Sequence, residues 1–328
     1  MDNVTHTLYG LALAKTGLDR IAPQATLTLM VGANLPDVDF ISIFWGDINY
    51  LKYHRGITHS FAGILLGASV LASVVYWINN HLLKTRPASW KKFYWLSLTG
   101  VSSHLLLDFT NSYGIRPLLP FYNRWYAWDI VLIIDPWILL ALTLGLCLPF
   151  LFSLINQEIG VRSTESHRGA VVCLLMVLLY WVSKDVSHRQ AIAALEQNRY
   201  STGAALRFGA MPKFFNPFSW LGIVETETAY HVTEVGWTTN PNGFPVRNKL
   251  YHKPEQTEII ESAKRGPQTQ AFLEFARFPW FQVEPSVEGY TVTLRDLRFD
   301  FVARRRRGFV CTIEMDRQLH VLSENFRF

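Results

Sequence analysis

The chain has 328 residues, of which 49% are hydrophobic and only 17% are charged, and its formal net charge is +5. Soluble globular proteins carry about 25% charged residues, so the composition argues against a wholly soluble protein, and the small net charge gives no reason to expect a nucleic-acid partner. The shortage of charge is concentrated before about residue 183, which predicts a membrane-embedded first half. Three cysteines without a CxxC pair indicate neither a disulfide framework nor a thiolate metal site.

The amino-terminal segment reads MDNVTHTLYG. It has no basic region and carries an acid at Asp2, so it does not resemble a cleaved signal peptide. We expect an amphipathic helix here that carries His6. The apolar stretch at 25–45 is interrupted by NLPDVD, where a proline disfavours helix at the residue before it and two carboxylates would be costly at bilayer depth. We therefore predict a helix to about Asn34, then a loop and a short apolar segment.

Crossing a bilayer as a helix takes roughly 20 apolar residues. Four segments approach this requirement: 61–80, 93–108, 131–155 and 169–183. The sequence therefore predicts an α-helical integral membrane domain over residues 1–183, with about four spans in addition to the amino-terminal helices. Such a protein would be a multi-pass protein of the cell membrane, with the lipid bilayer as its first partner.

The character of the sequence changes after Lys184. Stretches such as TAYHVTEVGWTT and GYTVTLRDLRFDF alternate apolar and polar residues, and turn signals separate them. Residues 184–328 are therefore predicted to form a soluble, strand-rich α+β domain. The RRRR run at 304–307 lies between strand-like segments, and we interpret it as a solvated or lipid-facing strand edge rather than a nucleic-acid site.

Several polar residues in the first half of the chain are surrounded in sequence by apolar residues. His104 and Asp108 are four residues apart, so on a helix they point the same way and can reach one cation. Asp37 and Asp39 are two apart, which places both carboxylates on one side of an extended loop.

His54 and His59 lie five residues apart in YHRGITHSF, so they would diverge on a continuous helix. Gly56 can break that helix, and Thr58 can cap the span that follows, which would leave His59 in the first turn of the span. His59 then opens the first predicted span and Asp108 closes the second, so both lie on one membrane face. The acidic loop reaches the same face.

These side chains can therefore meet at one place, and imidazole with carboxylate but without thiolate suits zinc, with manganese or iron as alternatives. A single zinc takes three or four protein ligands, so either some candidates only orient the others or two ions are held. Paired ions are a standard device for attack on a phosphoester, and Arg55 would then clamp an anionic group. The candidate ligands are His6, Asp37, Asp39, His54, His59, His104 and Asp108.

The motifs DNVTHTLYG, NLPDVD, HRGITHS and HLLLD occur in this order and are followed by spans. Together they resemble the membrane-bound metal-dependent hydrolase family, which includes the YdjM and YfhP proteins of bacteria. The first three motifs are also loosely similar to bacterial zinc-dependent phospholipase C. The resemblance covers about residues 1–140 and implies a metal-dependent hydrolase in a bacterial inner membrane.

Two classes of function stay open on the sequence. The first is a hydrolase that acts on a phosphoester or another ester, such as a lipid, through a metal-activated water. The second is a non-catalytic membrane protein with a structural, sensed or transported ion. An open coordination position would distinguish them, because a catalytic ion keeps one and a structural ion does not.

Overall fold

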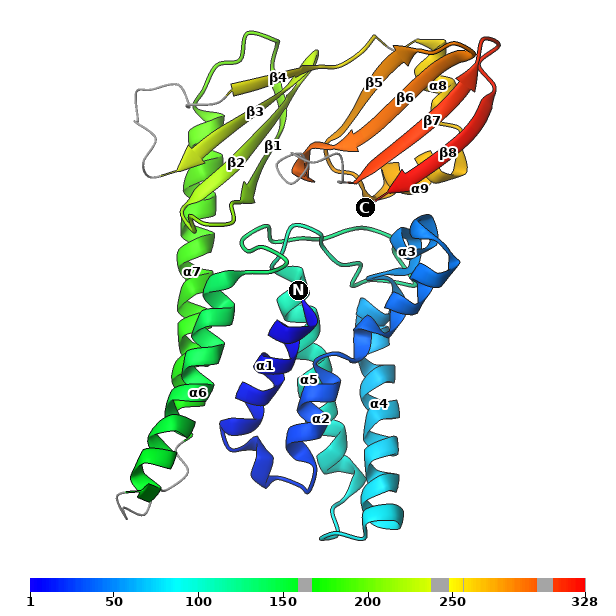
Figure 1. The fold of residues 1–328 in the computed structure, drawn as a ribbon. Helices are drawn as coiled ribbons and strands as arrows, with labels where there is room; N and C mark the ends of the chain where they lie inside the picture. Colours follow the sequence, from blue (N-terminus) through cyan, green and yellow to red (C-terminus); the bar gives the residue numbers. More distant parts are fainter. Residues whose placement is uncertain (159–166, 237–247, 256, 300–308, 328) are drawn as a thin grey trace. The chain divides into compact units, whose positions relative to one another are not determined.

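The structure of the protein is a computed structural model (Figure 1). The RRRR run lies outside the residues that it describes, which are 1–158, 167–236, 248–255, 257–299 and 309–327. The chain separates into two compact units, the first made of residues 1–39 and 55–185 and the second of residues 40–54 and 186–328.

The first unit is helical, and its neighbouring helices pack side by side (Figure 1). Asp2 is the N-cap of the first helix, because its carboxylate accepts hydrogen bonds from the backbone N–H groups of Val4 and Thr5 at 3.1 and 3.0 Å. The α-helices are α1 (Asn3–Lys15), α2 (Ala25–Gly32), α4 (Phe61–Trp77), α5 (Trp90–Phe109), α6 (Pro136–Glu158) and α7 (Arg168–Glu196). The 3-10 helices are η1 (Leu18–Arg20), η2 (Leu35–Trp45) and η3 (Ile57–His59), and η4 (Ile78–Leu83) is π-helical.

Two glycines allow α2 and α5 to approach each other closely. A Cβ atom at Gly32 would lie 3.2 Å from the Cα of Gly100, and one at Gly100 would lie 2.9 Å from the backbone oxygen of Leu29. Any larger side chain at this crossing would push the two backbones apart. The end of α2 is therefore held against the middle of α5.

Two described helices are long and apolar enough to cross a membrane: Phe61–Leu83, of 23 residues, and Arg168–Glu196, of 29 residues. The pair α2 and η2 is bent by 42°, and it makes a third candidate if it is one span. The four spans predicted from the sequence are not confirmed. In α5 the second half carries the buried polar residues His104 and Asp108. Among the residues whose side chains the structure describes, α6 contributes a shorter apolar helix, Pro136–Pro149.

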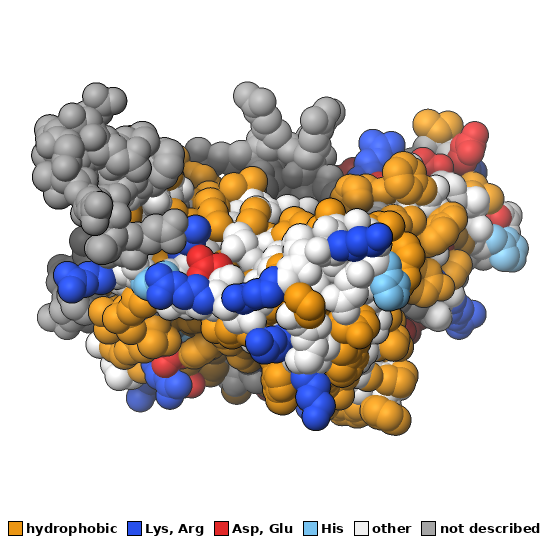
Figure 2. All heavy atoms as spheres, turned by 90° about the horizontal axis from the view of Figure 1, so that it is seen from below, with side chains coloured by type: hydrophobic (Ala, Val, Ile, Leu, Met, Phe, Trp, Pro, Cys, Tyr) orange, Lys and Arg blue, Asp and Glu red, His pale blue; other side chains and the backbone are white. Residues whose placement is uncertain are grey.

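Large apolar side chains cover the outside of the two span helices. Leu66 of α4 is 68% exposed and Leu179 of α7 is 66% exposed. Exposure of this kind is costly in water but neutral against lipid tails. Figure 2 shows the end of the molecule that carries the α4–α5 connection, with Lys and Arg side chains among hydrophobic ones. This is the composition expected where helix ends meet a membrane surface.

The second unit contains two antiparallel sheets, as well as α3 (Asp47–Tyr53), α8 (Glu258–Ala263), α9 (Pro267–Phe275) and η5 (Leu297–Phe299). In each sheet the strands follow one another in chain order. A shared apolar core joins the sheets, and the hydroxyl of Tyr230 donates to the backbone oxygen of Pro279 at 2.9 Å. The strands are β1 (Ala205–Pro212), β2 (Ser219–Thr226), β3 (Ala229–Gly236) and β4 (Asn248–His252), then β5 (Pro279–Pro285), β6 (Gly289–Asp296), β7 (Val310–Asp316) and β8 (Val321–Arg327).

The start of α4 gives a test of this packing. A Cβ atom at Gly63 would lie 2.0 Å from the backbone oxygen of Ile57, whereas one at Gly67 would meet only a side-chain carbon of Leu35 at 3.4 Å. In an open helical position glycine-to-alanine exchange stabilises by about 1 kcal/mol. We therefore expect Gly63→Ala to lower the thermal unfolding temperature in detergent and Gly67→Ala to leave it unchanged or raise it. Equal behaviour of the two variants would contradict the close approach of η3 and α4.

Candidate metal centre

His59 occupies a short turn before the first span helix. The turn is η3, and Ser60 follows it in extended conformation as the N-cap of α4, with its hydroxyl accepting the N–H of Gly63 at 3.0 Å. The prediction that Thr58 caps the span was wrong, because the Thr58 hydroxyl donates instead to Asp39 at 2.5 Å. His59 is therefore fixed before the helix rather than in its first turn.

Four side chains from three segments converge at one buried point. Asp37 comes from η2, His59 from η3, and His104 and Asp108 from successive turns of α5. The Nε2 atoms of the two histidines are 2.9 Å apart. Each also lies near both carboxylates: His59 is 3.4 Å from Asp37 and 3.3 Å from Asp108, and His104 is 3.5 Å from each.

The outer nitrogen of each ring faces an acceptor. His104 Nδ1 lies 2.7 Å from the backbone oxygen of Ala33, and His59 Nδ1 lies 3.1 Å from the carboxylate of Asp39. Both acceptors favour a proton on Nδ1, so each Nε2 turns a lone pair toward the cluster. Histidine ligands of metal ions are oriented in this way by carboxylates and backbone carbonyls.

The spacing of these atoms fits one ion. Four ligand atoms about 2.0–2.2 Å from a tetrahedral ion are about 3.3–3.6 Å apart, and four of the distances between the cluster atoms fall between 3.3 and 3.5 Å. All four ligand atoms lie within 4.8 Å of one another. Their side chains are fully buried except for Asp37, which keeps 13% exposure. The arrangement can hold a metal ion. Because Asp37 is the one ligand with exposed surface, another molecule can reach the ion at Asp37.

Arg55 holds the other oxygen of Asp108. Its guanidinium donates to Asp108 Oδ1 and Asn111 Oδ1, each at 3.0 Å, and to the backbone oxygen of Gly114 at 3.2 Å. The Arg55 backbone N–H also donates to Asp39 at 3.0 Å. These contacts direct Asp108 Oδ2 toward the histidines, and this oxygen has no hydrogen-bond partner among the described residues. The role of substrate clamp stays a prediction for Arg55.

His6 lies directly beside the cluster. Its ring stacks on that of His104 with centroids 3.9 Å apart, and its Nε2 is 3.4 Å from Asp108 Oδ1. Within the described part of the chain, neither ring nitrogen has a hydrogen-bond partner, although the side chain is fully buried. A buried imidazole in this condition is costly, which agrees with a position next to an ion.

Asp39 and His54, the two other predicted ligands, are not among the four converging residues. Asp39 contacts the outer nitrogen of His59, so in this cluster it orients a histidine rather than joining the four converging atoms. His54 ends α3 in the second unit, where its buried ring stacks on Tyr50 with centroids 4.4 Å apart. Metal ligation by either residue stays a prediction.

Sequence reasoning missed several supporting groups. Asn111 accepts from Arg55, Thr58 donates to Asp39, and the carbonyl of Ala33 orients His104. Asn111 gave a signal, because it is a polar residue three positions after Asp108 at the end of an apolar helix. A backbone carbonyl gives no signal in a sequence, so the partner of His104 could not be found there.

The helical unit and its cluster define a class of protein: a membrane protein with a buried histidine and carboxylate centre, followed by a two-sheet α/β domain. Residues 1–191 match the family described as YdjM inner membrane protein. Because this match covers more than half of the chain, the protein belongs to the YdjM inner membrane protein family, and the resemblance to the YdjM and YfhP proteins that the motifs predict is confirmed.

The second unit has a match of its own. Residues 258–327 match the YfhP C-terminal alpha/beta plait domain. The whole chain is similar to a protein of Bacillus subtilis (strain 168) with the printed name "Uncharacterized protein YfhP", at 22% identity over 339 residues that cover 98% of this chain and 94% of the relative. No solved structure matches the chain.

The pairing of Arg55 with Asp108 can be tested by stability. Both side chains are buried, and removal of one partner of a buried ion pair costs about 3–5 kcal/mol. We expect Arg55→Met to lower the thermal unfolding temperature in detergent, and Arg55→Met combined with Asp108→Asn to recover part of the loss. Arg20→Met changes an exposed arginine of the same unit and should have little effect. An Arg55→Met protein as stable as the wild type would contradict the pairing.

Proposed function

We propose that this protein is a membrane-bound metal-dependent hydrolase that acts on a phosphoester or another ester. One observation carries the proposal: two imidazole Nε2 atoms and two carboxylate oxygens face one another at a buried point. With Nδ1 protonated on both rings, all four atoms are acceptors, and acceptors in a low-dielectric interior repel one another. A divalent cation removes this repulsion.

The chain's own residues have distinct parts in this proposal. Asp37, His59, His104 and Asp108 would hold the ion. Asp39 and the carbonyl of Ala33 keep the rings in the ligating tautomer, and Arg55 keeps Asp108 in place. The metal ion that these residues would hold would supply Lewis acidity and the activation of water.

Zinc is the first choice for this ion, with manganese or iron as alternatives. Imidazole nitrogen suits zinc and iron, carboxylate oxygen suits manganese, and the cluster contains no thiolate that would demand a softer ion. The proposal needs one ion at the four converging atoms. His6 adjoins this position and is the residue through which a second ion or a further ligand would be added.

A non-catalytic ion is the alternative, and one observation favours it. Four protein ligands complete a tetrahedral shell, which is typical of structural zinc sites. A hydrolase needs a position for substrate, so in the proposed function Asp37, the ligand with exposed surface, lies where substrate approaches.

Metal content and hydrolysis together test the proposal. We expect protein purified without chelator to contain stoichiometric transition metal and to hydrolyse a chromogenic phosphodiester or carboxylic ester. His59→Ala and Asp37→Ala should each lose the metal and lower hydrolysis at least about 100-fold, because each removes a ligand. His81→Ala, an exposed histidine of η4, is the control and should change neither. A wild-type protein without metal would rule out the centre, and bound metal without turnover of either ester would favour the non-catalytic alternative.

The role of Asp39 gives a separate test. Asp39→Asn replaces an acceptor by an amide that can also donate, so His59 loses the fixed proton on Nδ1. Loss of such an outer partner lowers metal affinity about 10–100-fold. We expect competition with a metal indicator to measure this loss while the folded protein keeps its thermal stability within a few degrees. Unchanged affinity would show that Asp39 does not orient His59.

A further inference from the structure

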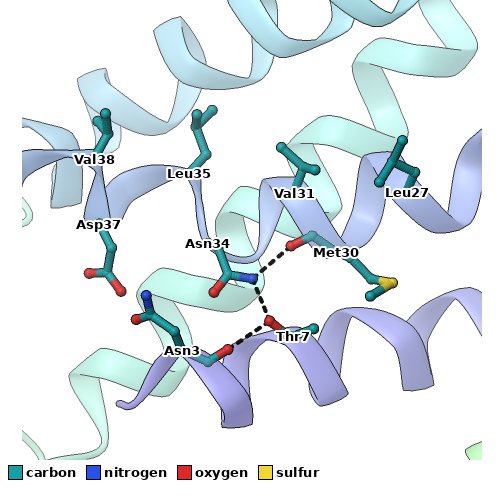
Figure 3. Close-up of a pocket in the computed structure, with 9 residues that line it drawn as sticks. All are labelled: Asn3, Thr7, Leu27, Met30, Val31, Asn34, Leu35, Asp37 and Val38. Atoms are coloured by element: carbon teal, nitrogen blue, oxygen red, sulfur yellow. Dashed lines mark hydrogen bonds between the residues drawn. The ribbon is translucent and has the colours of Figure 1, made fainter.

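An open groove runs along α1, α2 and the start of η2, and it ends at the metal centre. Its volume is about 510 Å³, and Asp37 is one of its lining residues (Figure 3). Ligand pockets for small molecules have volumes of about 300–1,000 Å³. Because Asp37 also belongs to the four converging atoms, a molecule in the groove reaches the centre at this residue.

One wall of the groove is apolar. Leu27 and Val38 of this wall are 58% and 52% exposed, so the groove is open along its side. The wall belongs to the bent helix pair that makes the third candidate span. Its side chains are those of Leu27, Met30, Val31, Leu35 and Val38.

The rest of the lining is polar, but most of its hydrogen-bond donors already bind acceptors within the protein. The Asn34 amide donates to Thr7 Oγ1 at 3.0 Å and to the backbone oxygen of Met30 at 2.8 Å, and the Thr7 hydroxyl donates to the backbone oxygen of Asn3 at 2.7 Å. Figure 3 shows the side chains of Asn3 and Asp37 directed toward each other at one end of the groove. Asn3 and Asp37 therefore place polar side chains where the groove meets the centre.

The charge of the groove indicates the class of ligand. None of its nine lining residues is Lys or Arg, and Asp37 is its single charged side chain. A soluble phosphorylated compound would find no basic partner along the walls, whereas a hydrocarbon chain would find five apolar side chains. A lateral opening on apolar helices also lets such a chain enter from the bilayer.

We propose that this groove binds one hydrocarbon chain of a membrane lipid and thereby presents the ester or phosphoester of its headgroup to the metal centre. This inference rests on the proposed hydrolase function for the second step, but the binding of the chain does not require the metal. The substrate class of the enzyme is then a lipid, selected by its chain rather than by contacts with its charge.

Photo-crosslinking tests the binding step. The full-length protein in detergent is incubated with a stoichiometric amount of a phospholipid that carries a diazirine near the end of one acyl chain, irradiated, digested and mapped by mass spectrometry. We expect adducts on the 27–38 segment that saturate with lipid and are displaced by unlabelled phospholipid. Val31→Trp fills the groove and should lose most of this adduct, and Leu27→Trp provides a second variant on the same wall.

The controls separate the groove from the bilayer surface and from the metal. Leu66→Trp changes an equally apolar and exposed position on α4 and should keep the adduct. His104→Ala removes a metal ligand outside the groove and should keep the adduct although hydrolysis is lost. In the wild-type protein, an adduct without hydrolysis would count against the hydrolase and not against the groove. Adducts spread equally over α2 and α4, or retained in both tryptophan variants of the groove, would overturn the proposal. A crosslink between two copies through α2 in place of the lipid adduct would overturn it as well.

Discussion

The helical unit depends on the burial of two imidazoles and two carboxylates at one point. Buried polar groups without partners are costly, so each member of the cluster requires a second group behind it. The carbonyl of Ala33 holds His104, Asp39 holds His59, and Arg55 holds Asp108. These second groups come from segments far apart in the chain, so the cluster ties α2, η2, η3 and α5 together.

Small residues give the backbone the freedom that this arrangement needs. Gly32 and Gly100 bring α2 against α5, and one turn beyond Gly100 the ring of His104 reaches the carbonyl that follows Gly32. Gly63 lets η3 lie against the first turn of α4. Ligand positions must be fixed within about 0.5 Å for a functional site, and backbone contacts of this kind provide that precision. The centre is built on the backbone as much as on its side chains.

The four converging residues all belong to the first unit, and the two sheets of the second unit have a core of their own. The second unit also has a separate family match over residues 258–327. The groove that ends at Asp37 has an apolar wall, and none of its lining residues is basic. In the proposed function, affinity for a hydrocarbon and reactivity toward an ester would reside in neighbouring parts of the helical unit.

The sequence by itself determined the membrane character, the strand-rich second part, and the pairing of His104 with Asp108 through their spacing on one helix face. It also determined the family, because the motifs occur in a fixed order. It did not determine the number of spans, the cap at Ser60, or the position of Asp39 behind His59. These three features depend on how closely helices from distant segments approach each other. The local sequence pattern does not encode those distances. Only the tertiary structure decided which acidic side chains face the centre and which support a histidine, because that depends on the distances between η2, η3 and α5.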